Sequence, residues 1–338
     1  MKSKENSSEK KNDSDFIESL TKGVLSNNTS ILGKAITLVE SERREHQKLA
    51  NTLLEKCITH RADSIRIGVT GVPGVGKSTF IEAFGKLFIN DGKKLAVLTV
   101  DPSSSMTKGS ILGDKTRMEA LSKNPNAFIR PSASGGSLGG VARKTQETII
   151  LLEAAGYDTI IIETVGVGQS ETAVREMVDF FLLLKLPGAG DELQGIKRGV
   201  MEMADAIAIN KADGDNIKSA ELAATEFKRA LHLFAPKASG WTPEVFTCSA
   251  LKNKGLKEIL SCIKNYVAQN RESGFFERAR QHQNKNWFKR HLENSLLKDF
   301  HENPEISNSL EQLENQVVKG EITPFMAAER LLKTYRDI

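Results

Sequence analysis

A glycine-rich segment that lies between an apolar run and a helical pattern constrains the fold of this chain more than any other feature. It reads Gly71-Val72-Pro73-Gly74-Val75-Gly76-Lys77-Ser78-Thr79, follows the apolar run Ile65–Thr70 and precedes the helical pattern Phe80–Phe88. This arrangement is typical of a phosphate-binding P-loop, in which the glycines let successive backbone N–H groups point inward, Lys77 reaches the β- and γ-phosphates, and Ser78 offers its hydroxyl to Mg²⁺. The following helix adds its positive dipole end beneath the phosphates. We therefore expect the chain to bind a nucleoside triphosphate.

Short apolar runs alternate with helical patterns from residue 65 onward, which predicts βαβ units and a parallel sheet. Several of these runs are apolar on both faces, as a sheet with helices on both sides requires. The fold class that we expect is α/β: a P-loop NTPase with a mostly parallel central sheet, helices on both faces, and helical extensions at both ends. The predicted strands are Ile65–Thr70, Leu95–Val100, Ala127–Arg130, Thr159–Thr164, Phe180–Leu186, Ala206–Asn210 and Val245–Cys248.

The chain divides into four predicted parts. Residues 1–15 are almost all Lys, Glu, Ser, Asn and Asp and predict a disordered tail, because such a segment cannot bury a core. Residues 16–62 predict a helical N-terminal extension, 63–270 the nucleotide-binding domain, and 271–338 a helical C-terminal arm.

Apolar residues recur at helical spacing in the arm, and Thr323-Pro324 predicts the start of its last helix. The apolar faces of these helices need a surface to pack on. Either they fold back on the nucleotide-binding domain or they form a homodimer interface, and the sequence leaves both open.

Composition narrows the classes of protein to consider. No apolar run reaches the roughly 18 residues of a membrane span, and a net charge of +4 over 338 residues gives no reason to expect nucleic acid as a partner. The three cysteines, Cys57, Cys248 and Cys262, have no metal-type spacing and fit a reducing compartment. We expect a cytoplasmic protein.

Two further segments predict which base is bound. Asn210-Lys211-Ala212-Asp213 follows the sixth predicted strand and Ser249-Ala250-Leu251 follows the seventh. The Asp213 carboxylate can accept hydrogen bonds from the ring N–H and the exocyclic amine of guanine, whereas adenine presents the wrong donors. Lys211 would lie along the base, and the Ala250 N–H would meet the guanine O6. The pair of segments favours GTP over ATP; alone, the first would be equally explained by helix capping.

Carboxylates end two other predicted strands, at the edge where the γ-phosphate and Mg²⁺ would lie. Asp101 ends the second strand and Glu163 ends the fourth. Because Mg²⁺ keeps several waters, Ser78 with these carboxylates is a sufficient ligand set. Gly166, in Glu163-x-x-Gly166, can donate its N–H to the γ-phosphate. The next residue is Val167, where Ras-type enzymes have a water-orienting glutamine, so we expect slow hydrolysis that a partner or a loop completes. Gln169 is a weaker candidate for that role.

Taken together, these segments resemble those of the MeaB/ArgK subfamily of P-loop GTPases, in which a glutamate replaces the usual aspartate of the third nucleotide motif. The resemblance runs from about Ile36 to Arg336. It rests on Asp101-Pro102-Ser103-Ser104-Ser105, Gly109-Ser110-Ile111-Leu112-Gly113-Asp114-Lys115-Thr116-Arg117-Met118, Glu163-Thr164-Val165-Gly166-Val167-Gly168-Gln169-Ser170, Gly190-Asp191-Glu192-Leu193-Gln194-Gly195-Ile196-Lys197 and the Asn210 tetrad.

The resemblance implies a homodimeric GTPase that serves an adenosylcobalamin-dependent methylmalonyl-CoA mutase, or a related acyl-CoA mutase, by gating cofactor loading and reactivation. It adds Asp114 to the metal set of Ser78, Asp101 and Glu163, and it adds Lys197 to the catalytic set of Lys77, Asp101 and Glu163. It assigns dimerisation to the C-terminal arm.

Three other functions remain as alternatives. A protein kinase would need an acceptor-side base, and the tetrad argues against ATP. A metal-insertion GTPase would need clustered His or Cys, whereas the six histidines are scattered along the chain. A nucleotide-dependent scaffold without relevant turnover is the third, and Val167 is the residue that favours it.

Overall fold

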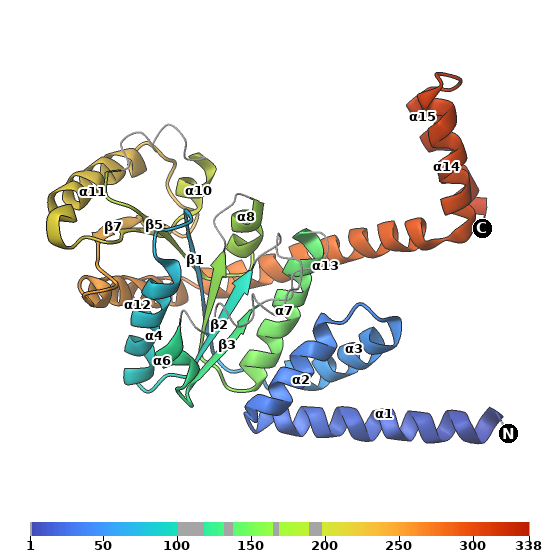
Figure 1. The fold of residues 1–338 in the computed structure, drawn as a ribbon, viewed down its shortest axis with the longest axis horizontal. Coiled ribbons are helices and arrows are strands. Elements are labelled where there is room, and N and C mark those ends of the chain that lie inside the picture. Colours follow the sequence, from blue (N-terminus) through green and yellow to red (C-terminus); the bar gives the residue numbers. More distant parts are fainter. Residues whose placement is uncertain (1, 101–117, 132–137, 165–168, 189–197, 338) are drawn as a thin grey trace. The chain divides into compact units, whose positions relative to one another are not determined.

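In a computed structural model of the chain, seven strands form one sheet in which every neighbouring pair is parallel (Figure 1). The structure describes residues 2–100, 118–131, 138–164, 169–188 and 198–337. The strand order is β3-β2-β4-β1-β5-β6-β7. The expected α/β fold is confirmed, and no predicted strand end is displaced by more than one residue. The strands are β1 (Ile65–Gly71), β2 (Leu95–Val100), β3 (Ala127–Pro131), β4 (Thr159–Thr164), β5 (Phe180–Lys185), β6 (Ala206–Ile209) and β7 (Glu244–Thr247).

Helices cover both faces of this sheet, which explains why its inner strands are buried at nearly every position. Alternate residues of the strands point to opposite faces. One face packs against α4 (Lys77–Asn90) and α12 (Leu256–Glu272), in a core that includes Phe80, Phe84 and Ile259. The short helix α6 (Glu119–Ser122) contacts α4.

Of the helices in the described part of the chain, the other face carries α7 (Leu138–Ala154), α8 (Gln169–Arg175), α10 (Arg198–Met203) and α11 (Ile217–Leu231). Helix α8 lies close to β1 at Gly68, where a Cβ would lie only 3.2 Å from the Val174 side chain of α8. A 3-10 turn, Gly214–Asn216, leads into α11.

The N-terminal extension is a packed group of helices, α1 (Lys2–Leu25), α2 (Thr29–Glu40) and α3 (Arg44–Ile58), which contact one another and α7. Helix α1 includes residues 2–15, for which a disordered tail was predicted, and the disorder of that tail stays a prediction. The apolar stripe Ile17, Leu20 and Val24 is buried and fixes the second half of α1. Lys and Glu, common in the first half, are good helix formers, so the helix extends upstream of the residues that anchor it.

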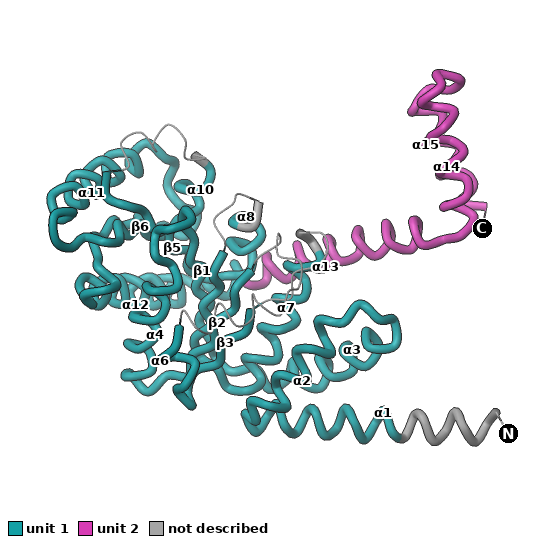
Figure 2. Tube along the Cα trace, viewed as in Figure 1, with its two compact units in different colours: residues 1–279 teal, residues 280–338 magenta. Residues whose placement is uncertain are grey.

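The chain divides into two compact units, residues 1–279 and 280–338 (Figure 2). The division falls inside α13 (Phe275–Glu302), whereas the predicted arm begins at residue 271. In the second unit, α14 (Pro304–Val318) packs against α15 (Pro324–Asp337). The predicted N-cap of α15 is confirmed, since the Met326 N–H donates to Thr323 Oγ1 at 3.2 Å.

Among the helices that the structure describes, none combines the length and the apolar composition that a membrane span requires.

Candidate nucleotide-binding site

The predicted P-loop connects β1 to α4 at the carboxyl edge of the sheet, and its backbone needs glycine at two positions. Gly71 has a φ of 155°, and a Cβ there would lie 2.6 Å from the Leu184 carbonyl oxygen. Gly76, the residue before α4, has a φ of 91°, and a Cβ there would lie 3.0 Å from Asn210 Nδ2. The left-handed backbone and the close neighbours together exclude side chains at these positions.

Lys77, the first residue of α4, is buried, and its ammonium lies against the loop itself. Its Nζ donates to the Gly71 carbonyl at 2.8 Å and to the Val72 carbonyl at 3.4 Å. Carbonyl partners hold the charge in place without neutralising it. The arrangement keeps a cation beside the helix N-terminus, where an anion is favoured.

Ser78 and Glu163 meet at the junction of β1 and β4. The Ser78 hydroxyl donates to Glu163 Oε1 at 3.3 Å, and Glu163 is 7% exposed. A buried hydrogen bond of 2.8 Å from Thr164 Oγ1 to Thr70 Oγ1 joins the ends of the same two strands. A hydroxyl beside a carboxylate is a donor set that suits Mg²⁺, which takes few protein ligands and keeps its waters. The described residues contain no group of three or more His, Cys, Asp or Glu side chains that could hold a metal ion, and a Mg²⁺ site of this kind does not need one.

Asn210 connects three segments that are far apart in sequence. It follows β6 and is 2% exposed. Its Nδ2 donates to the Val75 carbonyl of the P-loop at 2.9 Å, and its Oδ1 accepts from the Ala250 N–H at 3.1 Å. Lys211, at a φ of 60°, donates to the Gly74 carbonyl at 2.8 Å. The first predicted base-recognition segment is therefore hydrogen-bonded both to the loop that would hold the phosphates and to the second segment.

Asp213 and Ser249 also lie together. The Ser249 hydroxyl donates to Asp213 Oδ2 and accepts from the Lys252 N–H at 3.1 Å. The Ala212 N–H donates to the Cys248 carbonyl at 2.9 Å, which joins the two loops through their backbones. Burial raises the pKa of the Cys248 thiol to about 12, so this cysteine stays protonated.

The structure thus brings together most of the predicted site. Leu251 is 72% exposed at the rim, and Thr79 lies in the first turn of α4. Four predicted site residues, Asp101, Asp114, Gly166 and Lys197, lie outside the described residues, as does Val167.

A parallel sheet with a P-loop after its central strand, hydrogen-bonded to an Asn-Lys-x-Asp segment, defines the class of P-loop NTPases. The comparisons with known proteins agree. The family model described as methylmalonyl-CoA mutase-associated GTPase MeaB matches residues 32–305. The GTPase ArgK of Escherichia coli is 46% identical over 87% of this chain and 88% of its own length.

Two further similarities extend over most of the chain. The methylmalonic aciduria type A homolog, mitochondrial, of Caenorhabditis elegans is 44% identical over 94% of this chain and 83% of its own length. A crystal structure of a LAO/AO transport system kinase superposes with a TM-score of 0.75 at 37% identity, covering 95% of this chain and 97% of that one. This chain belongs to the MeaB/ArgK family of GTPases, as the resemblance predicted.

Proposed function

We propose that this protein is a GTP-hydrolysing chaperone of an adenosylcobalamin-dependent methylmalonyl-CoA mutase, or of a related acyl-CoA mutase, and that it gates the loading and reactivation of the mutase cofactor. The observation that carries the nucleotide part is Asn210, because its hydrogen bonds to Val75 and Ala250 join phosphate loop and base loop into one site. The family match supports the mutase as partner.

In the proposed complex, the backbone N–H groups of residues 71–79 and the Lys77 ammonium hold the phosphates. Asp213 accepts hydrogen bonds from the guanine ring N–H and amine. These replace the hydrogen bond that Asp213 accepts from the Ser249 hydroxyl in this structure. Charge-assisted hydrogen bonds of this kind contribute roughly 1.5–3 kcal/mol each, which is enough to discriminate against adenine. Ala250 is the residue after Ser249, and the hydrogen bond from its N–H to Asn210 Oδ1 fixes its position.

Mg²⁺ belongs to the same proposal, held by Ser78 directly and by Glu163, with Asp101 and Asp114 completing the set. When bound, the ion would neutralise charge on the phosphate oxygens. Ser78 and Glu163 are already in contact at 3.3 Å, so the ion would replace their hydrogen bond. With Val167 after Gly166 no side chain at that position orients water, and we expect slow hydrolysis in the isolated protein that the partner accelerates.

Homodimerisation through the C-terminal arm is also proposed. Phe288, Leu292 and Leu296 recur every four residues on α13 and are 68%, 50% and 54% exposed. Residues four apart lie on one face of a helix, so these side chains form an apolar stripe in the second unit. A second copy of the same stripe is a self-complementary surface for it.

A cytoplasmic location, without a membrane or nucleic-acid partner, completes the proposal. The cysteines that the structure describes, Cys57, Cys248 and Cys262, are free and buried, which fits a reducing compartment. The relative in C. elegans is described as mitochondrial, so the compartment needs its own measurement by fractionation.

Phosphoryl transfer to a protein is the second candidate, favoured by the crystal structure of a relative described as a transport system kinase. Incubation with labelled GTP and labelled ATP distinguishes the two functions. Hydrolysis predicts labelled inorganic phosphate from GTP, whereas a kinase predicts label on an acceptor protein.

The decisive experiment captures partners from native cell extract with the full chain, loaded with a nonhydrolysable GTP analogue. We expect an adenosylcobalamin-dependent mutase to be retained. Asp213→Asn is the specific control. The new amide N–H donates toward a position where guanine also donates, whereas the same amide complements xanthine. This variant is expected to lose GTP affinity, gain affinity for xanthosine triphosphate, and retain the mutase only with the xanthosine analogue. Unchanged GTP affinity in the variant contradicts the assignment of Asp213, and capture that does not depend on nucleotide contradicts gating.

A further inference from the structure

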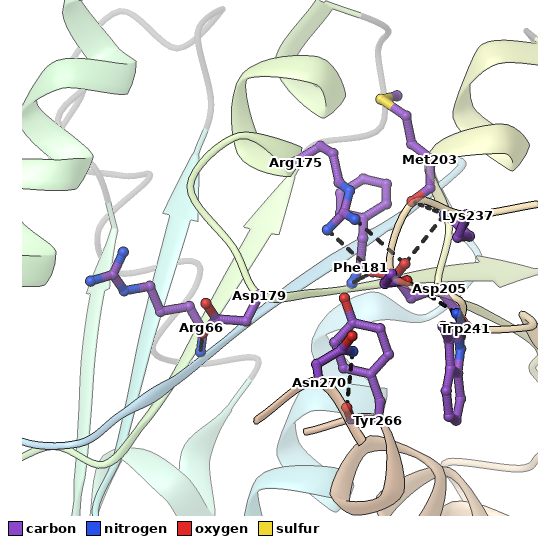
Figure 3. A network of polar contacts seen from close by, with 11 residues as sticks. Arg66, Arg175, Asp179, Phe181, Met203, Asp205, Lys237, Trp241, Tyr266 and Asn270 are labelled. Atoms are coloured by element: carbon purple, nitrogen blue, oxygen red, sulfur yellow. Dashed lines mark hydrogen bonds and ion pairs between the residues drawn. The ribbon is translucent and has the colours of Figure 1, made fainter. Parts of the chain in front are cut away.

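A second polar cluster lies at the opposite, amino edge of the sheet, centred on Asp205 (Figure 3). Asp205 directly precedes β6 and is 1% exposed. Its Oδ2 accepts from the Phe181 N–H at 2.9 Å, and its own N–H donates to the Phe181 carbonyl at 2.8 Å. The Trp241 indole N–H donates to its carbonyl at 2.9 Å. These bonds fix the carboxylate to β5 and leave it directed at two cations.

The first cation comes from α8. Arg175, the last residue of that helix, forms a two-point ion pair with Asp205: Nη1 lies 3.2 Å from Oδ2, and Nη2 lies 3.4 Å from Oδ1. Burial lowers the pKa of Arg175, but the charge of Asp205 and contact with the Tyr266 hydroxyl outweigh it, so the net shift is upward. The C-terminus of α8 is therefore held to the start of β6 by a charged contact.

The second cation comes from the loop after α11 and holds α10. Lys237 Nζ lies 3.2 Å from Asp205 Oδ1 and donates to the carbonyl of Met203, the last residue of α10, at 3.1 Å. A cation at a helix C-terminus also complements the helix dipole. Through Lys237, Asp205 is connected to the end of α10 as well as to the end of α8.

The positions of α8 and α10 in the chain make this cluster relevant to the nucleotide site. Helix α8 begins at Gln169, three residues after Gly166 of the Glu163-x-x-Gly166 segment. Helix α10 begins at Arg198, directly after Lys197. Both helices lie on the same face of the sheet and contact each other. One buried carboxylate thus links the helix that follows the Glu163 segment to the helix that follows Lys197, a residue of the predicted catalytic set.

We propose that Asp205 is a positioning residue that couples α8 to α10 through Arg175 and Lys237, so that a change at the Glu163 segment on loss of the γ-phosphate is transmitted to α10. The inference rests on the proposed role of the Glu163 segment at the γ-phosphate. The ion pairs supply the coupling, since a rigid charged contact moves as a unit and a buried carboxylate resists losing either cation. Direct packing of α8 on α10 is the competing route.

Hydrogen exchange of the full chain tests this coupling. Amide exchange is compared between the GDP-bound protein and the protein with a nonhydrolysable GTP analogue, both with Mg²⁺, in peptides that cover α8 and α10. In the wild type we expect both helices to exchange at least threefold more slowly with the GTP analogue. In Arg175→Gln and in Lys237→Gln, α8 keeps its response and the α10 response is lost. Affinity for both nucleotides stays within twofold, and Arg175→Lys recovers part of the α10 response.

Arg61→Gln is the matched control. Arg61 is paired with the buried Glu153 and is 26% exposed at its side chain, as Arg175 is. Each of the two carboxylates keeps a second cation, Arg66 for Glu153 and Lys237 for Asp205. The control therefore loses a comparable ion pair that does not join α8 to α10.

Each outcome decides a separate point. A normal α10 response in Arg175→Gln and Lys237→Gln overturns the coupling and favours direct packing. Loss of the response in Arg61→Gln as well overturns it in favour of general destabilisation. A wild type in which α8 responds and α10 does not overturns the coupling alone and leaves the proposed function standing. A wild type in which neither helix responds overturns both.

Discussion

Replacing Asn210 by alanine is expected to weaken nucleotide binding without touching any group that contacts the nucleotide phosphates directly. The side chain is 2% exposed and makes one hydrogen bond to the Val75 carbonyl and one from the Ala250 N–H. Asn210→Ala leaves both backbone groups buried without these partners, at about 1–3 kcal/mol each. We therefore expect the free energy of unfolding to fall by about 2–6 kcal/mol, since the two penalties apply together.

Part of this loss should appear in binding, because the P-loop and the base loop lose their common support. If half of about 3 kcal/mol must be recovered on binding, the dissociation constant for GDP rises roughly tenfold. Titration calorimetry with Mg²⁺ and GDP measures this change, and urea unfolding measures the stability.

Asn270→Ala is the matched control for this prediction. Asn270 is also a buried asparagine, 1% exposed, but it lies in α12, and its Nδ2 donates to the Tyr266 carbonyl at 2.9 Å. It should lower stability and leave GDP affinity unchanged. If Asn210→Ala loses stability and binds GDP as tightly as the control does, the cross-connection has no role in binding and the reasoning is refuted.

Three further predictions concern separate parts of the chain. Lys77→Ala should lose roughly 10- to 100-fold in GTP affinity by calorimetry, the value of one charge-assisted contact to phosphate; an unchanged constant would contradict the P-loop. Burial alone would raise the pKa of Glu153, but its two arginines outweigh burial and the net shift is below the ordinary 4.5. The contribution of Glu153 to the free energy of unfolding is therefore complete above pH 4.5 and is lost as the pH falls through the lowered pKa. Glu153→Gln should cost about 3 kcal/mol at neutral pH and make urea stability less dependent on pH below 4.5; an equal slope would refute this. Leu292→Asp should yield monomers in sedimentation, whereas Lys285→Asp on the same helix should not; dimers in both variants would remove the proposed stripe.

The strands could be predicted from sequence because their signal is local. Runs such as Phe180–Leu184 are apolar throughout and lie between helical patterns, so burial on both faces follows from composition alone. The P-loop was equally accessible, since its glycines, lysine and serine are adjacent in the chain. Where the pattern weakened, the prediction weakened too: the polar first half of α1 gave no stripe to mark a helix.

The connections within the site were beyond sequence reasoning because their partners are distant. Asn210 and Val75 are 135 positions apart, and nothing in either motif indicates that the amide of one meets the carbonyl of the other. The pairing of Arg175 with Asp205, 30 positions apart, is equally hidden, because arginine and aspartate are common and only the fold selects this pair. The start of α13 at Phe275 was hidden for another reason, since residues 275–286 carry no regular apolar spacing.

The two polar clusters lie at the two ends of one strand. Asp205 precedes β6 and Asn210 follows it, with the fully buried Ala206–Ile209 between them. Four residues of strand span roughly 13 Å, so neither side chain reaches the other. Yet a packed, parallel strand between β5 and β7 resists deformation along its axis. Asn210 holds the P-loop and Asp205 holds α8 and α10, so β6 is the rigid element against which both the nucleotide loop and the two helices are positioned.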